Sequence, residues 1–424
     1  MSIENAIALA LLASTVCFIT AIERRMFGRQ ILTPFAILAV PLVVVMTSAA
    51  IFAPVVGYIG LRPQAAILWT LLLPVFWVGG LVVMTCFVKH PRIWLRRRHE
   101  LCKTDEQLLW LVFSVAALFA IVDVTTALEQ LHGLNVVLLV NRTDRVIYTG
   151  SALHTQMQAV LQLALVLFTG EVDRRRWYMM APILACICLL FLTGSRGVYV
   201  LPIVGGLLYR RLTGKFTHFA AKAAGIAFAV VILSTGSTVI AISGWKADAL
   251  TDSVVYADAL DRTFSYLWAG VLPLGEQLAS GAKVPEDDRL RVYAPMINIW
   301  RRVTGTYETS YEPRGVLFSP LQDSFTTGEG SNVNTLFGTV YLYRGWLESA
   351  VVAFLLGSAS YGLYMSFFTP GLWWCKGIAA FFLSGLFFGW FEYYYWHGVF
   401  VSVLALGGVL QLLSIAGRTL SRRS

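Results

Sequence analysis

Long runs of hydrophobic residues alternate with short polar stretches along most of the chain. Many of these runs approach or exceed the ~18 residues that indicate a helix crossing a bilayer. The pattern predicts about eleven membrane-spanning helices, with one large polar segment between the eighth and the ninth. The expected spans are residues 4–22, 31–52, 65–88, 108–128, 151–170, 178–195, 197–209, 219–243, 346–367, 377–391 and 398–416.

Composition agrees with this pattern. The 424 residues are 57% hydrophobic and 13% charged, whereas soluble proteins carry about 25% charged residues. We therefore predict an all-α polytopic membrane protein with eight spans in residues 1–244, a large outer loop at 245–344 and three spans in 345–424. The first apolar run has no basic region before it, so it is expected to remain as a span rather than to be cleaved as a signal peptide.

Basic residues gather at the ends of the apolar runs, and this distribution sets the expected orientation. The net charge is +9, but clusters beside membrane spans indicate cytoplasmic loops rather than a nucleic-acid surface. The N-terminus is predicted to lie outside, the C-terminus in the cytoplasm and the large loop at the outer face. The clusters are Arg24-Arg25, Arg96–Arg98, Arg174–Arg176, Arg210-Arg211 and Arg422-Arg423.

One apolar stretch, Met179–Leu208, is too long for a single span. At ~1.5 Å per residue its 30 residues would reach ~45 Å, against a hydrocarbon core of ~30 Å. A single span would also separate two basic clusters, so the stretch is predicted to be a hairpin with "TGSRG" as its outer turn. Arg196 would then lie below the outer headgroups, which requires a water-filled cavity or an anionic partner. The alternative is a structural arginine that binds loop carbonyls.

Two amphipathic helices are expected in the outer loop, at residues 251–270 and 289–303, followed by an ordered loop over a cavity. Its arginines and tyrosines suggest a phosphorylated, sugar-bearing ligand, because guanidinium groups match phosphate oxygens. Both residue types also enrich ordinary interfaces. The candidate binding residues are Arg289, Arg291, Arg314, Arg344 and Tyr311.

The last outer turn, "WFEYYYWHGVF", places Glu392 and His397 among seven aromatic residues. A desolvated glutamate or histidine is a candidate general base, although the turn also fits an aromatic belt at the membrane interface. Glu348 and Glu312 are weaker candidates. His154 could line the same cavity or make a buried hydrogen bond.

No cofactor and no metal site are predicted. "PEDDR" is the only acidic cluster of the outer loop, and Glu286–Asp288 fits a helix cap equally well. The six cysteines are assigned to spans and cytoplasmic loops, which gives no disulfide framework in the outer loop.

Two motifs resemble a known family. "LTGSRGVYVLPIVGGLLYRRL" is similar to the Ser-Arg-Gly span of bacterial O-antigen polymerases of the Wzy type and of the related O-antigen ligases. "SNVNTLFGTVYLYRGWLESAVVAFLLGSASYGLY" resembles the segment that closes their large periplasmic loop, although Arg344 and Glu348 make it more charged than in that family. The layout of about eleven spans with a late outer loop matches as well.

This resemblance implies a metal-independent glycosyltransferase with a GT-C-like helix bundle in the bacterial inner membrane. Donor and acceptor would be undecaprenyl-diphosphate-linked oligosaccharides, and a chain-length regulator is a further expected partner. Arg196 would stabilise the leaving diphosphate, with Glu392 or His397 as the base. An O-antigen ligase that uses a lipid A-core acceptor is the nearest alternative, and a lipid-linked oligosaccharide transporter is a non-enzymatic one.

Overall fold

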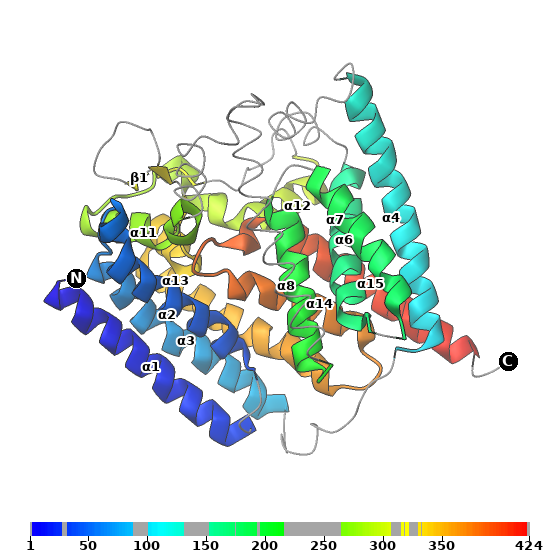
Figure 1. The fold of residues 1–424 in the computed structure, drawn as a ribbon, viewed down its shortest axis with the longest axis horizontal. Coiled ribbons are helices and arrows are strands. Elements are labelled where there is room, and N and C mark those ends of the chain that lie inside the picture. The colour runs from blue at the N-terminus through cyan, green and yellow to red at the C-terminus, as the bar shows by residue number, and fades with distance from the viewer. Residues whose placement is uncertain are drawn as a thin grey trace, which may run out of the picture. The chain divides into compact units, whose positions relative to one another are not determined.

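The computed structural model in Figure 1 describes residues 2–27, 32–87, 101–130, 152–173, 175–192, 196–215, 264–306, 315–317, 319–321, 330–331 and 333–421. The chain divides into two compact units, which are described separately. Unit 1 consists of Met1–Leu95, Phe264–Gly362 and Gly385–Gly398, and unit 2 of Arg96–Thr263, Leu363–Ser384 and Val399–Ser424. Each unit combines segments that are far apart in the sequence.

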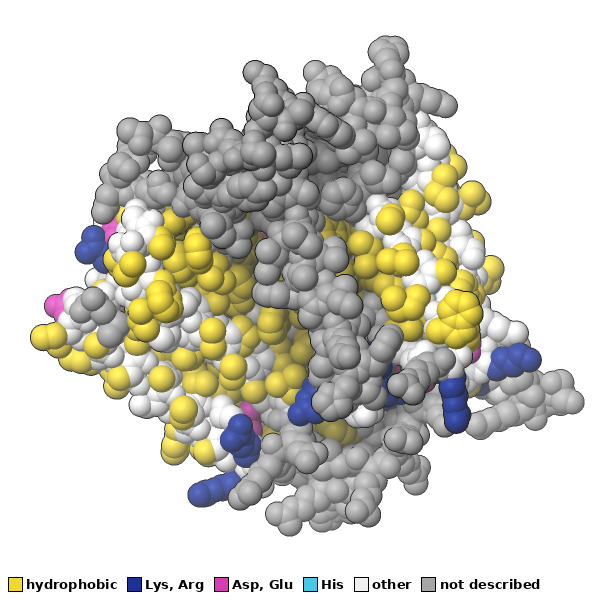
Figure 2. Space-filling model, in the orientation of Figure 1, with side chains coloured by type: hydrophobic (Ala, Val, Ile, Leu, Met, Phe, Trp, Pro, Cys, Tyr) yellow, Lys and Arg dark blue, Asp and Glu magenta, His cyan; other side chains and the backbone are white. Residues whose placement is uncertain are grey.

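Helices dominate the described residues, and six are long and apolar enough to cross a membrane. Their large apolar side chains are widely exposed, as lipid-facing residues are (Figure 2). The prediction of an all-α multi-pass membrane protein is therefore confirmed. The six are α1 (Ile3–Phe27), α2 (Pro34–Phe52), α3 (Pro63–Phe87), α4 (Lys103–Gln130), α13 (Leu336–Tyr364) and α15 (Gly398–Ser421).

Four more helices occupy the other predicted spans that the structure describes. Ten of the eleven predicted spans coincide with a helix, and the eighth, 219–243, lies outside the described residues. The four helices are α6 (Ala152–Glu171), α7 (Met180–Leu192), α8 (Arg196–Leu212) and α14 (Trp373–Phe387). Short 3₁₀ helices are η1 (Ala53–Val56), η3 (Trp177–Met179), η6 (Met365–Phe368) and η7 (Tyr394–Trp396).

In unit 1, helices α3 and α13 approach each other closely at two glycines. A Cβ atom on Gly79 would lie 2.1 Å from the carbonyl oxygen of Phe354, and one on Gly357 would lie 1.9 Å from that of Phe76. Backbone contact of this kind needs glycine on both helices, as in many packed membrane helices.

Helix α13 begins ten residues before the predicted span 346–367, which corrects the expectation that residues up to 344 form a loop. Thr335 caps the helix, because its Oγ1 accepts hydrogen bonds from Gly338 N (3.2 Å) and from Trp69 Nε1 (3.0 Å). Gly345, with φ of 81°, kinks the helix where the predicted span begins.

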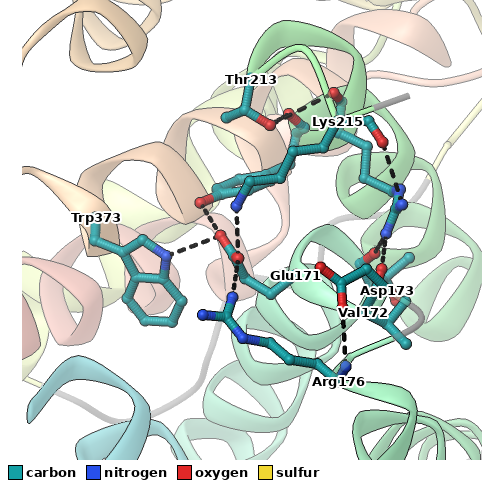
Figure 3. Close-up of polar contacts among 10 residues, drawn as sticks. Glu171, Val172, Asp173, Arg176, Thr213, Lys215 and Trp373 are labelled. Carbon is teal, nitrogen blue, oxygen red and sulfur yellow. Dashed lines mark hydrogen bonds and ion pairs between the residues drawn. The ribbon is translucent and has the colours of Figure 1, made fainter. Parts of the chain in front are cut away.

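In unit 2, the basic ends of α7 and α8 meet at Glu171, the last residue of α6 (Figure 3). Its buried carboxylate accepts hydrogen bonds from Arg176 Nη1 (3.0 Å) and Lys215 Nζ (2.6 Å). Arg210 binds the backbone oxygens of Thr169 (3.3 Å) and Val172 at the same end. Because Arg176 precedes α7 and Lys215 follows α8, the two helices run antiparallel, as the predicted hairpin requires. Residues 193–195 of its predicted turn lie outside the described part of the chain.

The segment of unit 1 before α13 contains α11 (Val271–Ala279), η5 (Glu286–Tyr293), α12 (Ala294–Thr304) and a two-residue antiparallel ladder of β1 (Ser319–Pro320) with β2 (Gly330–Ser331). The predicted helix 289–303 is confirmed for its second part, but its start is a 3₁₀ helix. Of the predicted helix 251–270, residues 264–268 are helical and residues 251–263 lie outside the described chain.

Candidate functional site

The turn between α14 and α15 brings together the two residues predicted as general bases. His397 Nε2 lies 3.2 Å from Glu392 Oε1, and the indole Nε1 of Trp396 is 3.2 Å from each of these atoms. Both the carboxylate and the imidazole are partly exposed. When His397 Nε2–H donates to Glu392, its Nδ1 is left as the acceptor that a general base requires.

A carboxylate next to an imidazole is a useful pair for acid–base chemistry. It fixes the tautomer and orientation of the ring and stabilises the imidazolium that forms when the base takes a proton. Trp396 holds this pair from the side, because it is buried and, in this tautomer, its indole N–H donates to Glu392 Oε1. The arrangement can therefore remove a proton from a hydroxyl group placed near Nδ1.

Aromatic rings surround the pair. Tyr394 lies 6.0 Å from the His397 ring, and Tyr343 meets Trp396 edge to face at 6.1 Å. Burial raises the pKa of Tyr393 far above the ordinary value, so this phenol stays neutral. Flat apolar faces beside polar groups form a surface that suits a sugar ring.

A second polar group joins η5 to α13. Arg344 makes two hydrogen bonds of 2.6 Å to the carboxylate of Glu348, and the hydroxyl of Tyr293 donates to the same carboxylate at 2.9 Å. The guanidinium of Arg344 lies over the Tyr293 ring at 5.8 Å. Burial and the hydrogen bond to Glu348 raise the pKa of the Tyr293 phenol. Because η5 also packs against η7, this group adjoins the aromatic turn.

The predicted phosphate-binding arginines of this segment are paired with carboxylates. Arg289 Nη1 lies 3.2 Å from Glu286, and Arg291 forms an ion pair with Asp288. Arg344 and Glu348 form a third such pair. Each of these three arginines therefore has an acidic partner three or four residues away. A phosphate ligand at any of them would compete with that carboxylate.

Other predicted site residues cannot be placed in this cluster. Arg196 is the first residue of α8, and His154 lies in the first turn of α6, but the side chains of both lie outside the described part of the structure. Arg314, Tyr311 and Glu312 also lie outside it. Within the described residues, no group of three His, Cys, Asp or Glu side chains is arranged to hold a metal ion.

Sequence reasoning had not singled out two members of the site. Tyr293 was one of several outer tyrosines, and no local pattern relates it to Glu348, 55 residues away. Trp396 was assigned to the aromatic turn without a role. In contrast, the spacing of the arginine–carboxylate pairs is a recognisable signal, because residues three or four apart share a helix face.

Comparison with known proteins places the chain in a family. The sequence model of a family described as "Family of unknown function (DUF6337)" matches residues 58–419. The chain belongs to this family. No curated protein and no solved structure matches it.

Every candidate residue lies within the part of the chain shared with DUF6337. The matched range begins after α2 and ends in the last turn of α15, so it includes the Glu392–His397 turn, the Arg344–Glu348 pair and Arg196.

Proposed function

We propose that this chain is a metal-independent GT-C-type glycosyltransferase that polymerises lipid-linked oligosaccharide repeat units. It would transfer a growing glycan from undecaprenyl diphosphate to the non-reducing end of another lipid-linked unit. The reaction would take place at the periplasmic face of the bacterial inner membrane. The single observation that carries the proposal is the Glu392–His397 pair, 3.2 Å apart, within an aromatic turn of a multi-pass membrane protein.

The proposed reaction needs a base for the acceptor hydroxyl and a cation for the leaving diphosphate. The acceptor hydroxyl oxygen attacks the anomeric carbon of the donor while the bond to the diphosphate oxygen breaks. His397 Nδ1 takes the hydroxyl proton, and Glu392 stabilises the resulting imidazolium. The electron pair leaves with the diphosphate, whose growing charge needs a preorganised cation.

Arg196 is proposed as that cation. Its backbone lies at the first position of α8, opposite the end of the hairpin that carries Arg176 and Arg210. The 14 residues from Arg196 to Arg210, at ~1.5 Å each, separate Arg196 from the basic end by ~21 Å along α8, so Arg196 would lie near the opposite side of a ~30 Å hydrocarbon core. Lipid diphosphates lie at that level.

Genetic deletion followed by complementation tests the function. Cells without the gene should accumulate lipid-linked single repeat units and lose long glycan chains, and the natural gene should restore the chains. A normal chain-length ladder that is no longer attached to lipid A-core would indicate the ligase instead. Single units that remain inaccessible to an external glycosidase would indicate the transporter.

A purified-protein assay then tests the residues. The protein should polymerise repeat units extracted from the deletion strain, and activity should persist in excess EDTA. His397→Ala should lower turnover by on the order of 10²–10⁴, the contribution of a positioned general base. Lys283→Ala, at an exposed loop position, is the matched control and should behave as the natural protein. Full activity of a folded His397→Ala protein would exclude the proposed base.

A further inference from the structure

Helix α12 exposes four of its large apolar side chains instead of burying them. Met296, Ile299, Trp300 and Val303 are 69%, 46%, 68% and 77% exposed. Their spacing of three, four and seven residues places them in one stripe along the helix. A stripe of this kind normally faces a protein core.

The opposite side of the same helix is the more buried one, and it is mixed in character. Ala294 and Pro295 at the start of the helix are buried, and Ile297, Asn298 and Arg301 are half-buried. The large side chains of the stripe are thus more exposed than the polar Asn298 and Arg301, whereas on a water-exposed surface the polar residues point outward. The environment of the exposed stripe is therefore expected to be apolar.

The helix is joined to exposed apolar side chains of a candidate membrane span. Tyr293, the residue before α12, donates its hydrogen bond to Glu348 of α13 at 2.9 Å. Next to Glu348, Leu347 is 76% exposed, and Trp346 is exposed as well. Both belong to the candidate span Leu336–Phe368. Helix α12 is thus anchored to α13 beside side chains of a membrane span that are open to lipid.

We propose that α12 lies flat in the membrane interface, with the stripe of Met296, Ile299, Trp300 and Val303 in contact with lipid. Its eleven residues are ~16 Å long, too short to cross a bilayer but long enough to rest on one. Tryptophan favours the headgroup level, where its ring is apolar and its N–H is hydrated. The inference holds whether or not the proposed reaction is correct.

Photo-crosslinking in the full-length protein tests this contact. A single benzoylphenylalanine replaces Trp300 or, separately, Val303, so the native cysteines stay in place. The protein is reconstituted in vesicles of phosphatidylcholine and phosphatidylglycerol at a ratio of roughly 3:1. The vesicles also contain a fluorescent phosphatidylcholine. Position 347 is the lipid-facing control, and position 283, exposed on the loop between α11 and η5, is the water-facing control.

Illumination should attach lipid to positions 300 and 303 as efficiently as to position 347 and several-fold more than to position 283. Because both residues are exposed, their replacement should leave the fold intact, which size-exclusion chromatography checks. Lipid labelling at 300 and 303 no higher than at 283 would overturn the proposal. Covalent protein dimers in place of lipid adducts would also overturn it, since a second copy of the chain would then cover the stripe.

Discussion

Replacing Glu171 by glutamine should destabilise the protein strongly, because it removes a buried charge that two cations share. The carboxylate is fully buried and accepts hydrogen bonds from Arg176, Lys215 and also Tyr209 (2.7 Å) and Trp373 (3.2 Å) (Figure 3). A hydrogen bond to a charged group contributes about 1.5–3 kcal/mol. Arg176 and Lys215 are about a quarter exposed, so water recovers part of their loss, and we expect a net cost of about 2–4 kcal/mol.

Thermal unfolding in detergent measures this cost, with a thiol-reactive dye reporting exposure of the buried Cys186 in α7 after the exposed Cys17, Cys86 and Cys188 are replaced by serine. Each kcal/mol lowers the melting temperature by about 2–4 °C in domains of 150–250 residues. Glu286→Gln is the matched control, because it breaks the exposed pair with Arg289, and exposed pairs contribute only about 0.2–1 kcal/mol. Equal melting temperatures for the two variants would refute the reasoning that burial makes the Glu171 contacts strong.

Three further predictions test packing, capping and the proposed diphosphate contact. Gly357→Ala should separate α3 from α13 and lower the melting temperature in the same assay, whereas Gly362→Ala on the same helix, where a Cβ meets only a Val83 methyl at 3.9 Å, should be tolerated. Thr335→Val should cost about 1–2 kcal/mol through loss of the α13 cap, measured by the same melt, and an unchanged melting temperature would show that the cap contributes little. Arg196→Ala should keep the natural melting temperature but lower the polymerisation rate by a factor on the order of 10²–10³. Arg196→Lys should recover only part of the lost activity, because it restores the charge without the planar guanidinium. Near-natural activity of a folded Arg196→Ala protein would exclude the proposed contact of Arg196 with the diphosphate.

Charge and hydrophobicity along the chain were sufficient to predict the helical hairpin of α7 and α8. The argument needed only the length of Met179–Leu208 and the basic clusters on either side of it. Both properties are local, and the membrane converts them directly into geometry because a span has a fixed length and cytoplasmic loops retain positive charge. The structure shows this end of the hairpin held together at Glu171.

The partners of Glu171 could not be predicted in the same way. Tyr209 and Trp373 lie 38 and 202 residues from it, and no periodicity relates such positions. The early start of α13 was missed for a different reason. Thr335 is a suitable N-cap, but the charged Arg344 and the kink at Gly345 interrupt the apolar pattern that defined the span.

The sequence indicated several residues of the candidate site, but it did not indicate which of them contact one another. Glu392 and His397 were selected because acids and histidines are rare in an apolar turn, and the structure places them side by side. The arginines were selected as phosphate ligands by residue type alone. Their acidic partners three or four residues away were visible in the sequence, but were not used to discount them.

These ion pairs bear on how a diphosphate could be bound. Arg344 is held by two hydrogen bonds to Glu348 and by Tyr293, so a phosphate would have to displace a carboxylate already in a bidentate geometry. That exchange gains little, because one anion replaces another. The charge that develops on a leaving diphosphate is stabilised more effectively by a cation without a competing carboxylate nearby in sequence. Arg196 satisfies this condition, since the sequence around it, "LFLTGSRGVYVLP", contains no acid. The ion pairs therefore favour a structural role for Arg289, Arg291 and Arg344 and leave Arg196 as the stronger candidate for the reacting phosphate.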